Sequence, residues 1–212
     1  MATITTITSA EEIKLSVRRF SLEEFAAVAD ALPDDRLELI NGEIVMSPPP
    51  DEIHMERTGR IIQLFAYHIK EIEELGCWIG GSNFYYALPK ELRQRWTEEG
   101  AEGPSHVCPD ASICYRDYLG KDRRPPALLV VEVLSVSRQE HISRDLEIKA
   151  DIYAALEIPA YWVVDRRDAS VWAYTEPRDG KYTLRRQYKG DRVLPAPGLE
   201  FLSITAAQIF EQ

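Results

Sequence analysis

The chain has 212 residues and a mass of 24.2 kDa, which suits one domain with a sizeable core and excludes a second large domain. Hydrophobic residues make up 45% and charged residues 28%, and no uncharged apolar run approaches the roughly 18 residues of a membrane span, so the composition excludes a disordered or membrane-spanning chain. The net charge of -10 argues against a nucleic-acid partner, but residues 178–192 hold six bases against two acids, so charge does not decide the function.

Residues 1–19 show no strong hydrophobic period, and we expect them to form a loose arm ahead of a single domain over 20–212. The start of the chain has neither the basic segment nor the long apolar run of a secretory signal. The three cysteines form no CxxC pair, which suits a reducing compartment better than a disulfide framework. These features predict a cytoplasmic protein.

The domain is predicted to begin with a helix and a β-hairpin. Ser21-Leu-Glu-Glu24 has the form of a capping box and starts a helix that ends at Leu32. Segments 36–40 and 43–46 alternate in polarity on either side of Asn41-Gly42, the strongest short hairpin signal. Two strands of the sheet are therefore expected here.

The middle of the chain is predicted to hold a long helix and the central strand. Apolar residues at helical spacing indicate a helix over 53–75. Segments 77–88 and 107–115 are typical of strands, on either side of a charged loop at 90–103. The almost unbroken apolar run 128–134 predicts a strand that is covered on both faces.

The last third is predicted to hold a helix over 142–157, strands over 160–165 and 169–175, a basic hairpin arm at 181–188 and a short helix from Ser203. Between the first and the last helix, the order of elements is then ββ-α-βββ-α-βββ. This order predicts an α/β fold of the α+β kind, in which helices flank a mixed sheet.

Glu132 interrupts the apolar run 128–134. A carboxylate removed from water costs several kcal/mol unless a cation, a metal or a proton compensates it. We therefore expect a positive group opposite Glu132. The alternative is an edge strand on which Glu132 points to solvent or pairs with an arginine.

Lys149 stands where the helix pattern asks for an apolar residue, because the 4-3-4-3 spacing of the inward positions in 142–156 includes residue 149. The connection from Glu132 to this helix is short, so the ammonium group is expected to approach the carboxylate. Asp145 lies one turn earlier on nearly the same face. The alternative is a lysine that keeps its amine in water at the edge of the core.

Segment 106–114 alternates with period two, which puts these residues on one side of a strand: His106, Cys108, Asp110, Ser112 and Cys114. Pro109 favours an edge position or a bulge, and bulges often orient functional side chains. A zinc site of His106, Cys108 and Cys114 is an alternative, although this spacing matches no usual zinc module.

Glu38, in the first predicted strand, is a further candidate carboxylate unless it faces solvent. Two or three carboxylates with a lysine suit Mg²⁺ or Mn²⁺, which need only one or two carboxylates and keep waters for a phosphate-bearing substrate. The sequence has no GxSxG, GxxxxGK[ST], GxGxxG or HExxH motif. Metal-assisted hydrolysis is therefore the natural interpretation.

Several motifs in order resemble the Uma family of restriction endonucleases, a bacterial branch of the PD-(D/E)xK nuclease superfamily. They are RLELINGEIVMSPPP (36–50), His54 at a helix start, PDAS (109–112), LVVEVLS (129–135), Asp145-x3-Lys149-x3-Tyr153 and AYWVVD (160–165). The match runs from about Phe20 to Phe210. The resemblance implies a restriction-endonuclease-like core that holds one or two divalent metals.

The resemblance also implies roles for individual residues. Asp110 and Glu132 match the two metal-binding acids. The superfamily's usual lysine, two residues after the acid, is here Leu134, and members of this branch supply the lysine from the next helix, which matches Lys149. Glu38 matches an additional N-terminal acid. A histidine is also found in the family at the position of His54, to which no role is assigned.

These roles predict an endonuclease that uses Mg²⁺ or Mn²⁺ to hydrolyse phosphodiester bonds in nucleic acid, with DNA as the expected substrate. The carbonyl of Val133 is expected to be an extra metal ligand, Asp145 an accessory group, and Lys149 to orient the attacking water or stabilise the transition state. These basic residues are expected to contact phosphates: Arg185, Arg186, Lys189 and Arg192, with Arg123 and Arg124 as further candidates.

Two other classes of function share these features. One is a non-cleaving nucleic-acid-binding or interaction protein on the same fold, which the net charge of -10 favours. The other is a small-molecule phosphodiesterase with the same metal chemistry. A homodimer suits the cutting of both strands of a duplex, whereas nicking needs one site.

Overall fold

The computed structural model describes residues 19–47, 49–82, 84–88, 103–116, 126–135 and 144–211. The arm predicted at 1–19 and the loop predicted at 90–103 therefore lie almost wholly outside the described residues. So do Arg123, Arg124 and the first two residues of the helix predicted over 142–157. Among the helices that are described, none combines the length and the apolar character needed to cross a membrane.

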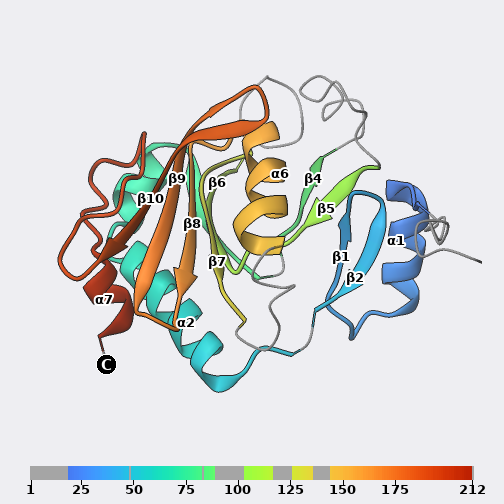
Figure 1. Cartoon of the computed structure of the whole chain (residues 1–212), viewed down its shortest axis with the longest axis horizontal. Coiled ribbons are helices and arrows are strands. Elements are labelled where there is room, and N and C mark those ends of the chain that lie inside the picture. Colours follow the sequence, from blue (N-terminus) through green and yellow to red (C-terminus); the bar gives the residue numbers. More distant parts are fainter. Residues whose placement is uncertain are drawn as a thin grey trace, which may run out of the picture.

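Helices and strands are mixed along the chain (Figure 1). The first half contains α1 (Leu22–Ala31), β1 (Leu37–Ile40), β2 (Glu43–Met46), α2 (Glu52–Ala66), α3 (Ile69–Glu74), β3 (Cys77–Gly81), β4 (Tyr86–Leu88), β5 (Ser105–Val107) and β6 (Ala111–Tyr115). The second half contains β7 (Ala127–Val133), a π-helix η1 (Arg144–Ile148), α6 (Lys149–Ala155), β8 (Ala160–Asp165), β9 (Ser170–Arg178), β10 (Lys181–Lys189) and α7 (Ala206–Phe210).

The described strands form two sheets, whereas the sequence predicts one. A six-stranded sheet has the order β10-β9-β8-β7-β6-β3 and is mixed, because β7 and β8 run parallel while the other neighbours are antiparallel. A four-stranded antiparallel sheet has the order β2-β1-β5-β4. Figure 1 shows the two sheets on either side of α6. The prediction of a mixed sheet with flanking helices is thus confirmed for the larger sheet.

Strand β7 is buried along its whole length, as its apolar run predicts. Because side chains alternate between the faces of a strand, Leu129, Val131 and Val133 pack into the core under α2 and α7, whereas Val130 packs into the core under α6. Glu132 shares the face of Val130. The position of this acid between the large sheet and α6 follows directly from the alternation.

The capping box at the start of α1 is confirmed. The Ser21 hydroxyl accepts a hydrogen bond from the Glu24 N–H at 3.1 Å, and the Glu24 carboxylate accepts one from the Ser21 N–H at 2.9 Å. The capping box therefore fixes the start of the helix at the residue that the sequence indicates. It packs against β1 through Phe25, Leu37 and Leu39.

Two of the predicted strands are each divided between the sheets. Segment 107–115 splits into β5 and β6 on either side of Pro109, and segment 77–88 splits into β3 and β4. The prediction that the odd and even residues of 106–114 line two faces of one strand is therefore wrong. The backbone between Val107 and Ala111 passes from one sheet to the other, which a period-two pattern alone does not reveal.

Two predicted helices also differ from the structure. The helix predicted over 53–75 begins at Glu52, with Asp51 as its N-cap, and is divided into α2 and α3 at Tyr67 and His68. In the described part of the helix predicted over 142–157, the first segment is the π-helix η1, and α6 follows it directly. The C-terminal helix begins at Ala206, capped by Thr205, rather than at residue 203.

Gly103 is expected to be essential for the packing of the β1–β2 turn. A Cβ atom there would lie 2.7 Å from the Asn41 carbonyl oxygen and 2.7 Å from the Gly42 Cα, whereas a Cβ at Gly59 in α2 would meet nothing within 4 Å. Gly103→Ala should lower the free energy of unfolding by about 1–3 kcal/mol, and the control Gly59→Ala should raise it by about 0.5–1 kcal/mol. Urea unfolding measures both, and equal stabilities would contradict the close approach.

Candidate active site

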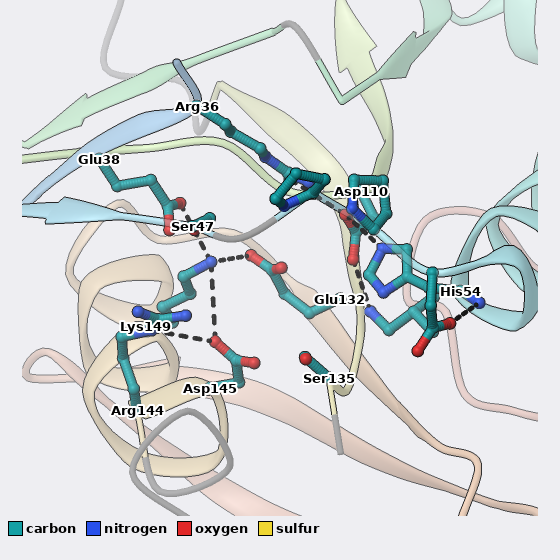
Figure 2. Close-up of a pocket in the computed structure, with 14 residues that line it drawn as sticks. Arg36, Glu38, Ser47, His54, Asp110, Glu132, Ser135, Arg144, Asp145 and Lys149 are labelled. Atoms are coloured by element: carbon teal, nitrogen blue, oxygen red, sulfur yellow. Dashed lines mark hydrogen bonds and ion pairs between the residues drawn. The ribbon is translucent and has the colours of Figure 1, made fainter. Parts of the chain in front are cut away.

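The carboxyl end of β7 opens into a pocket of about 230 Å³. Ligands of open α/β sheets commonly bind at this end of parallel strands. Its walls come from distant parts of the sequence, namely β1, α2, β7, η1, α6 and the turn before β6 (Figure 2). The pocket is lined by Arg36, Glu38, Ser47, Pro49, Pro50, Asp51, His54, Asp110, Glu132, Val133, Ser135, Arg144, Asp145 and Lys149.

Lys149 is the centre of a buried ion cluster. Its Nζ lies 2.8 Å from Oε1 of Glu132, 3.0 Å from Oε1 of Glu38 and 3.7 Å from Oδ1 of Asp145. The Tyr153 hydroxyl donates a hydrogen bond to the same Glu132 oxygen at 2.8 Å. The lysine therefore points inward and does not keep its amine in water at the edge of the core. Glu132 has the positive neighbour that its burial predicts.

Burial is the main electrostatic influence on this cluster. Loss of water raises the pKa of Glu132 to about 8, and the nearby carboxylates raise it too, while the Lys149 ammonium opposes the rise. Loss of water also disfavours a charged Lys149, but its three carboxylate neighbours outweigh this effect and raise its pKa above the ordinary value. Lys149 is thus an ammonium group, and its charge is shared among several acids.

Asp110 has a different environment from Glu132. Its Oδ2 accepts a hydrogen bond from the Val133 N–H at 2.8 Å, and its Oδ1 lies 3.0 Å from Arg36 and 3.1 Å from Nε2 of His54. Burial raises the pKa of Asp110, but the hydrogen bonds and positive neighbours outweigh it and lower this pKa to about 2. The two acids therefore differ in proton affinity, with Asp110 fully ionised.

Strand β1 carries one wall of the pocket. Leu37 and Leu39 pack under α1, so Arg36 and Glu38 point to the other side by period-two alternation. Oε1 of Glu38 accepts the Cys108 N–H at 2.8 Å, and its side chain is 1% exposed, so it does not face solvent. Arg36 was not predicted as a site residue, although its spacing of two from Glu38 is a signal that would have found it.

His54 owes its place to the start of α2. The Asp51 carboxylate accepts a hydrogen bond from the His54 N–H at 2.8 Å, which caps the helix, and it also pairs with Arg166 after β8. These contacts tie the first turn of α2 to the large sheet and direct the imidazole towards Asp110. The sequence indicated the position of His54 but not this contact.

The zinc alternative is not supported by the geometry. The His106 ring stacks on Tyr85 at 4.7 Å between centroids, the Cys108 thiol hydrogen-bonds the Ser82 carbonyl, and Cys114 lies in the other sheet. The structure therefore does not bring His106, Cys108 and Cys114 together.

The predicted phosphate-binding residues of the hairpin arm do not line the pocket. The Arg185 guanidinium lies over the rings of Trp172 and Tyr174, at 4.5 and 5.2 Å from their centroids. Lys189 pairs with Asp168 at 2.8 Å, and Arg186 is exposed on β10. These groups form a separate basic edge of the large sheet.

The comparisons with known proteins bear on this site. The chain matches the model of the Uma2 family, described as "Putative restriction endonuclease", over residues 22–207. It is also similar in structure to a protein from Anabaena variabilis ATCC 29413, described as a putative nuclease belonging to DUF820, with 15% sequence identity and a TM-score of 0.65 over 90% of this chain and 97% of that chain. A comparison with curated proteins finds no match.

Proposed function

This chain belongs to the Uma2 family of putative restriction endonucleases, and on that premise we propose that it is an endonuclease that uses Mg²⁺ or Mn²⁺ to hydrolyse phosphodiester bonds of DNA. The observation that carries the proposal is the convergence of Asp110, Glu132 and Lys149 in one pocket, from three separate parts of the sequence. The structural likeness to the protein described as a putative nuclease of DUF820 supports the fold on which this proposal relies.

The oxygen atoms of the pocket fit a hard divalent cation. In the part of the chain that is described, Oε2 of Glu38 and Oδ1 of Asp145 are buried without a hydrogen-bond partner, so the pocket has unsatisfied carboxylate oxygens. No group of three or more His, Cys, Asp or Glu is arranged as a ready-made metal site among the described residues. The proposed ligands are Asp110 and Glu132, which match the two metal-binding acids implied by the family resemblance, together with the Val133 carbonyl and water.

The Val133 carbonyl is included because of strand geometry. The N–H and C=O of one residue in an extended strand point to the same side, and the Val133 N–H donates to Asp110. Its carbonyl therefore faces the side of β7 on which Asp110 lies. Val133 and Asp110 together offer oxygens on that side.

The residues of the chain have separate roles in the proposed reaction. A bound Mg²⁺ supplies a Lewis acid for the scissile phosphate and lowers the pKa of a water ligand. Lys149 holds Glu132 and Glu38 in place and offers an ammonium charge to the transition state, in which negative charge grows on the phosphate oxygens. Glu38 is fixed by the Cys108 N–H and orients the lysine.

The basic edge of β10 is proposed to bind the flanking phosphates. Arg185 is held against two aromatic rings, so its guanidinium is positioned before any ligand arrives. Arg186 and Lys189 lie on the same strand, Lys189 in an exposed pair that a phosphate can replace. Phosphate contacts of this kind position a nucleic acid without reading its sequence. We propose a homodimer only if the protein cuts both strands of a DNA duplex, because nicking one strand needs a single site.

Incubation of the purified protein with supercoiled plasmid and Mg²⁺ or Mn²⁺ tests the proposal directly. Nicked or linear DNA is expected with metal, and intact DNA is expected with excess EDTA. Binding without cutting of DNA or RNA would favour the non-cleaving alternative, which the occupation of both Asp110 oxygens by donors supports. Turnover of a chromogenic phosphodiester without polymer cutting would favour the small-molecule alternative.

Millimolar Mg²⁺ or Mn²⁺ is expected to raise the melting temperature. The metal binds the folded pocket and not the unfolded chain, so a concentration about 100 times Kd adds about 2.7 kcal/mol to the free energy of unfolding. Calorimetry with and without metal measures the shift, and Asp110→Asn should remove most of it. The same melting temperature at all metal concentrations would count against a metal site in this pocket.

A further inference from the structure

Arg144, the first residue of η1, has a buried hydrogen-bond donor without an acceptor among the described residues. It lines the pocket and its side chain is 13% exposed. Its Nε lies 3.6 Å from Oδ1 of Asp145, which is beyond hydrogen-bond distance, and this buried nitrogen has no hydrogen-bond partner among the described residues. The other arginine in the pocket, Arg36, donates to the Cys108 carbonyl and to Asp110.

A guanidinium group stays charged at every physiological pH and has five N–H donors in a planar fork. Its removal from water without acceptors is unfavourable. The contact with Asp145 compensates the charge but leaves the buried Nε–H without an acceptor. Arg144 is therefore arranged for an acceptor that comes from outside the described chain, and the fork suits the oxygens of a phosphate.

The π-helix explains why Arg144 reaches the pocket. Arg144 precedes Lys149 by five residues. In an α-helix, which turns by about 100° per residue, the two side chains would point about 140° apart. A π-helix winds more loosely, with i→i+5 hydrogen bonds, and brings residues five apart towards one face. Figure 2 shows the Arg144 and Lys149 side chains next to each other in the pocket, both directed towards the Asp145 carboxylate.

We propose that Arg144 binds a phosphodiester group of the nucleic-acid backbone inside the pocket, and so positions the strand against Lys149 and Glu132. This inference rests on the proposed function, since the ligand is the backbone of its substrate. Arg144 acts by binding and positioning, and the β10 edge serves phosphates farther away. One turn of π-helix thus supplies the phosphate anchor and leads into the helix that carries the lysine.

DNA affinity measured without metal tests this proposal independently of DNA cutting. The affinity of Arg144→Gln, Arg144→Lys and the parent for a short fluorescein-labelled DNA duplex and its single strand is measured by anisotropy in EDTA over a salt series. The matched control is Arg116→Gln, which removes an equal charge from the far end of β6, where Arg116 pairs with Glu73 on the surface. Urea unfolding of each variant shows whether the fold is retained.

Arg144→Gln is expected to weaken binding about tenfold or more, because a hydrogen bond to a charged group is lost. The slope of log K against log salt should fall by about 0.9 on the duplex, as for one lost phosphate contact. Arg144→Lys should keep the slope and recover part of the affinity, while Arg116→Gln should match the parent.

Equal affinity and slope for Arg144→Gln and Arg116→Gln would overturn the inference. A loss of stability without a change in binding would do the same and would leave Arg144 as a partner of Asp145 alone. If the parent does not bind DNA in EDTA, the inference also fails, while cutting of plasmid by the parent with Mg²⁺ would still support the proposed function.

Discussion

Glu132→Gln should abolish the cutting of DNA while the protein stays folded. The amide oxygen still accepts from Lys149 and Tyr153, so the local hydrogen bonds persist. The charge that would hold Mg²⁺ is lost, and a metal contributes several kcal/mol to a phosphoryl transition state, so the cutting rate should fall at least about a thousandfold. Plasmid cutting under single-turnover conditions measures the rate.

The control for this change is Glu74→Gln, at the exposed end of α3. It alters the same functional group and the same net charge, and it should cut like the parent. In Glu132→Gln, the increase in melting temperature on adding Mg²⁺ should be mostly absent. This measurement does not depend on catalytic activity. A Glu132→Gln protein that cuts at the parent's rate would show that the proposed site is wrong.

The contact between Glu132 and Lys149 was predictable because a charged residue within an apolar sequence pattern is easily recognised. Glu132 and Lys149 each break an apolar pattern, on a strand and on a helix, and an isolated buried charge needs a partner of opposite sign. That requirement brings the two elements together without any knowledge of the fold. Their contact at 2.8 Å is the result that the two patterns predict in combination.

The division into two sheets was not predictable in the same way. Segments 77–88 and 107–115 keep a strand-like composition through the points at which they change sheets, and period two says which side a residue takes but not which neighbour it pairs with. Asp110 reaches the pocket because Pro109 interrupts the strand. The structure thus places Asp110 in the pocket with Glu132 and Lys149, while the predicted alternation around Asp110 is wrong.

The second arginine of the pocket was missed for a related reason. Helical periodicity assumes 3.6 residues per turn, and at that period Arg144 belongs to a different face from Lys149. Only the looser winding of η1 moves it to the pocket wall. Arg36, by contrast, follows the ordinary alternation of β1 and was missed because an arginine at the start of a strand is common on surfaces.

Lys149→Met should cost about 3–5 kcal/mol in the free energy of unfolding. Methionine fills most of the space of the lysine stem, but Glu132 and Glu38 lose the ammonium group that lies 2.8 and 3.0 Å from them. The two acids must then either stay charged without a cation or take up a proton, and either costs far more than burying a methionine. Urea unfolding measures the loss, and the exposed Lys70→Met is the control.

The double variant Lys149→Met with Glu132→Gln separates charge from shape. If the loss comes from uncompensated carboxylates, neutralising Glu132 should recover a large part of it, so the double variant should be more stable than Lys149→Met alone. Glu38 stays charged, so recovery should be incomplete, and adding Glu38→Gln should extend it. If Lys149→Met costs less than about 1 kcal/mol, or if the changes add independently, the lysine does not hold these acids together.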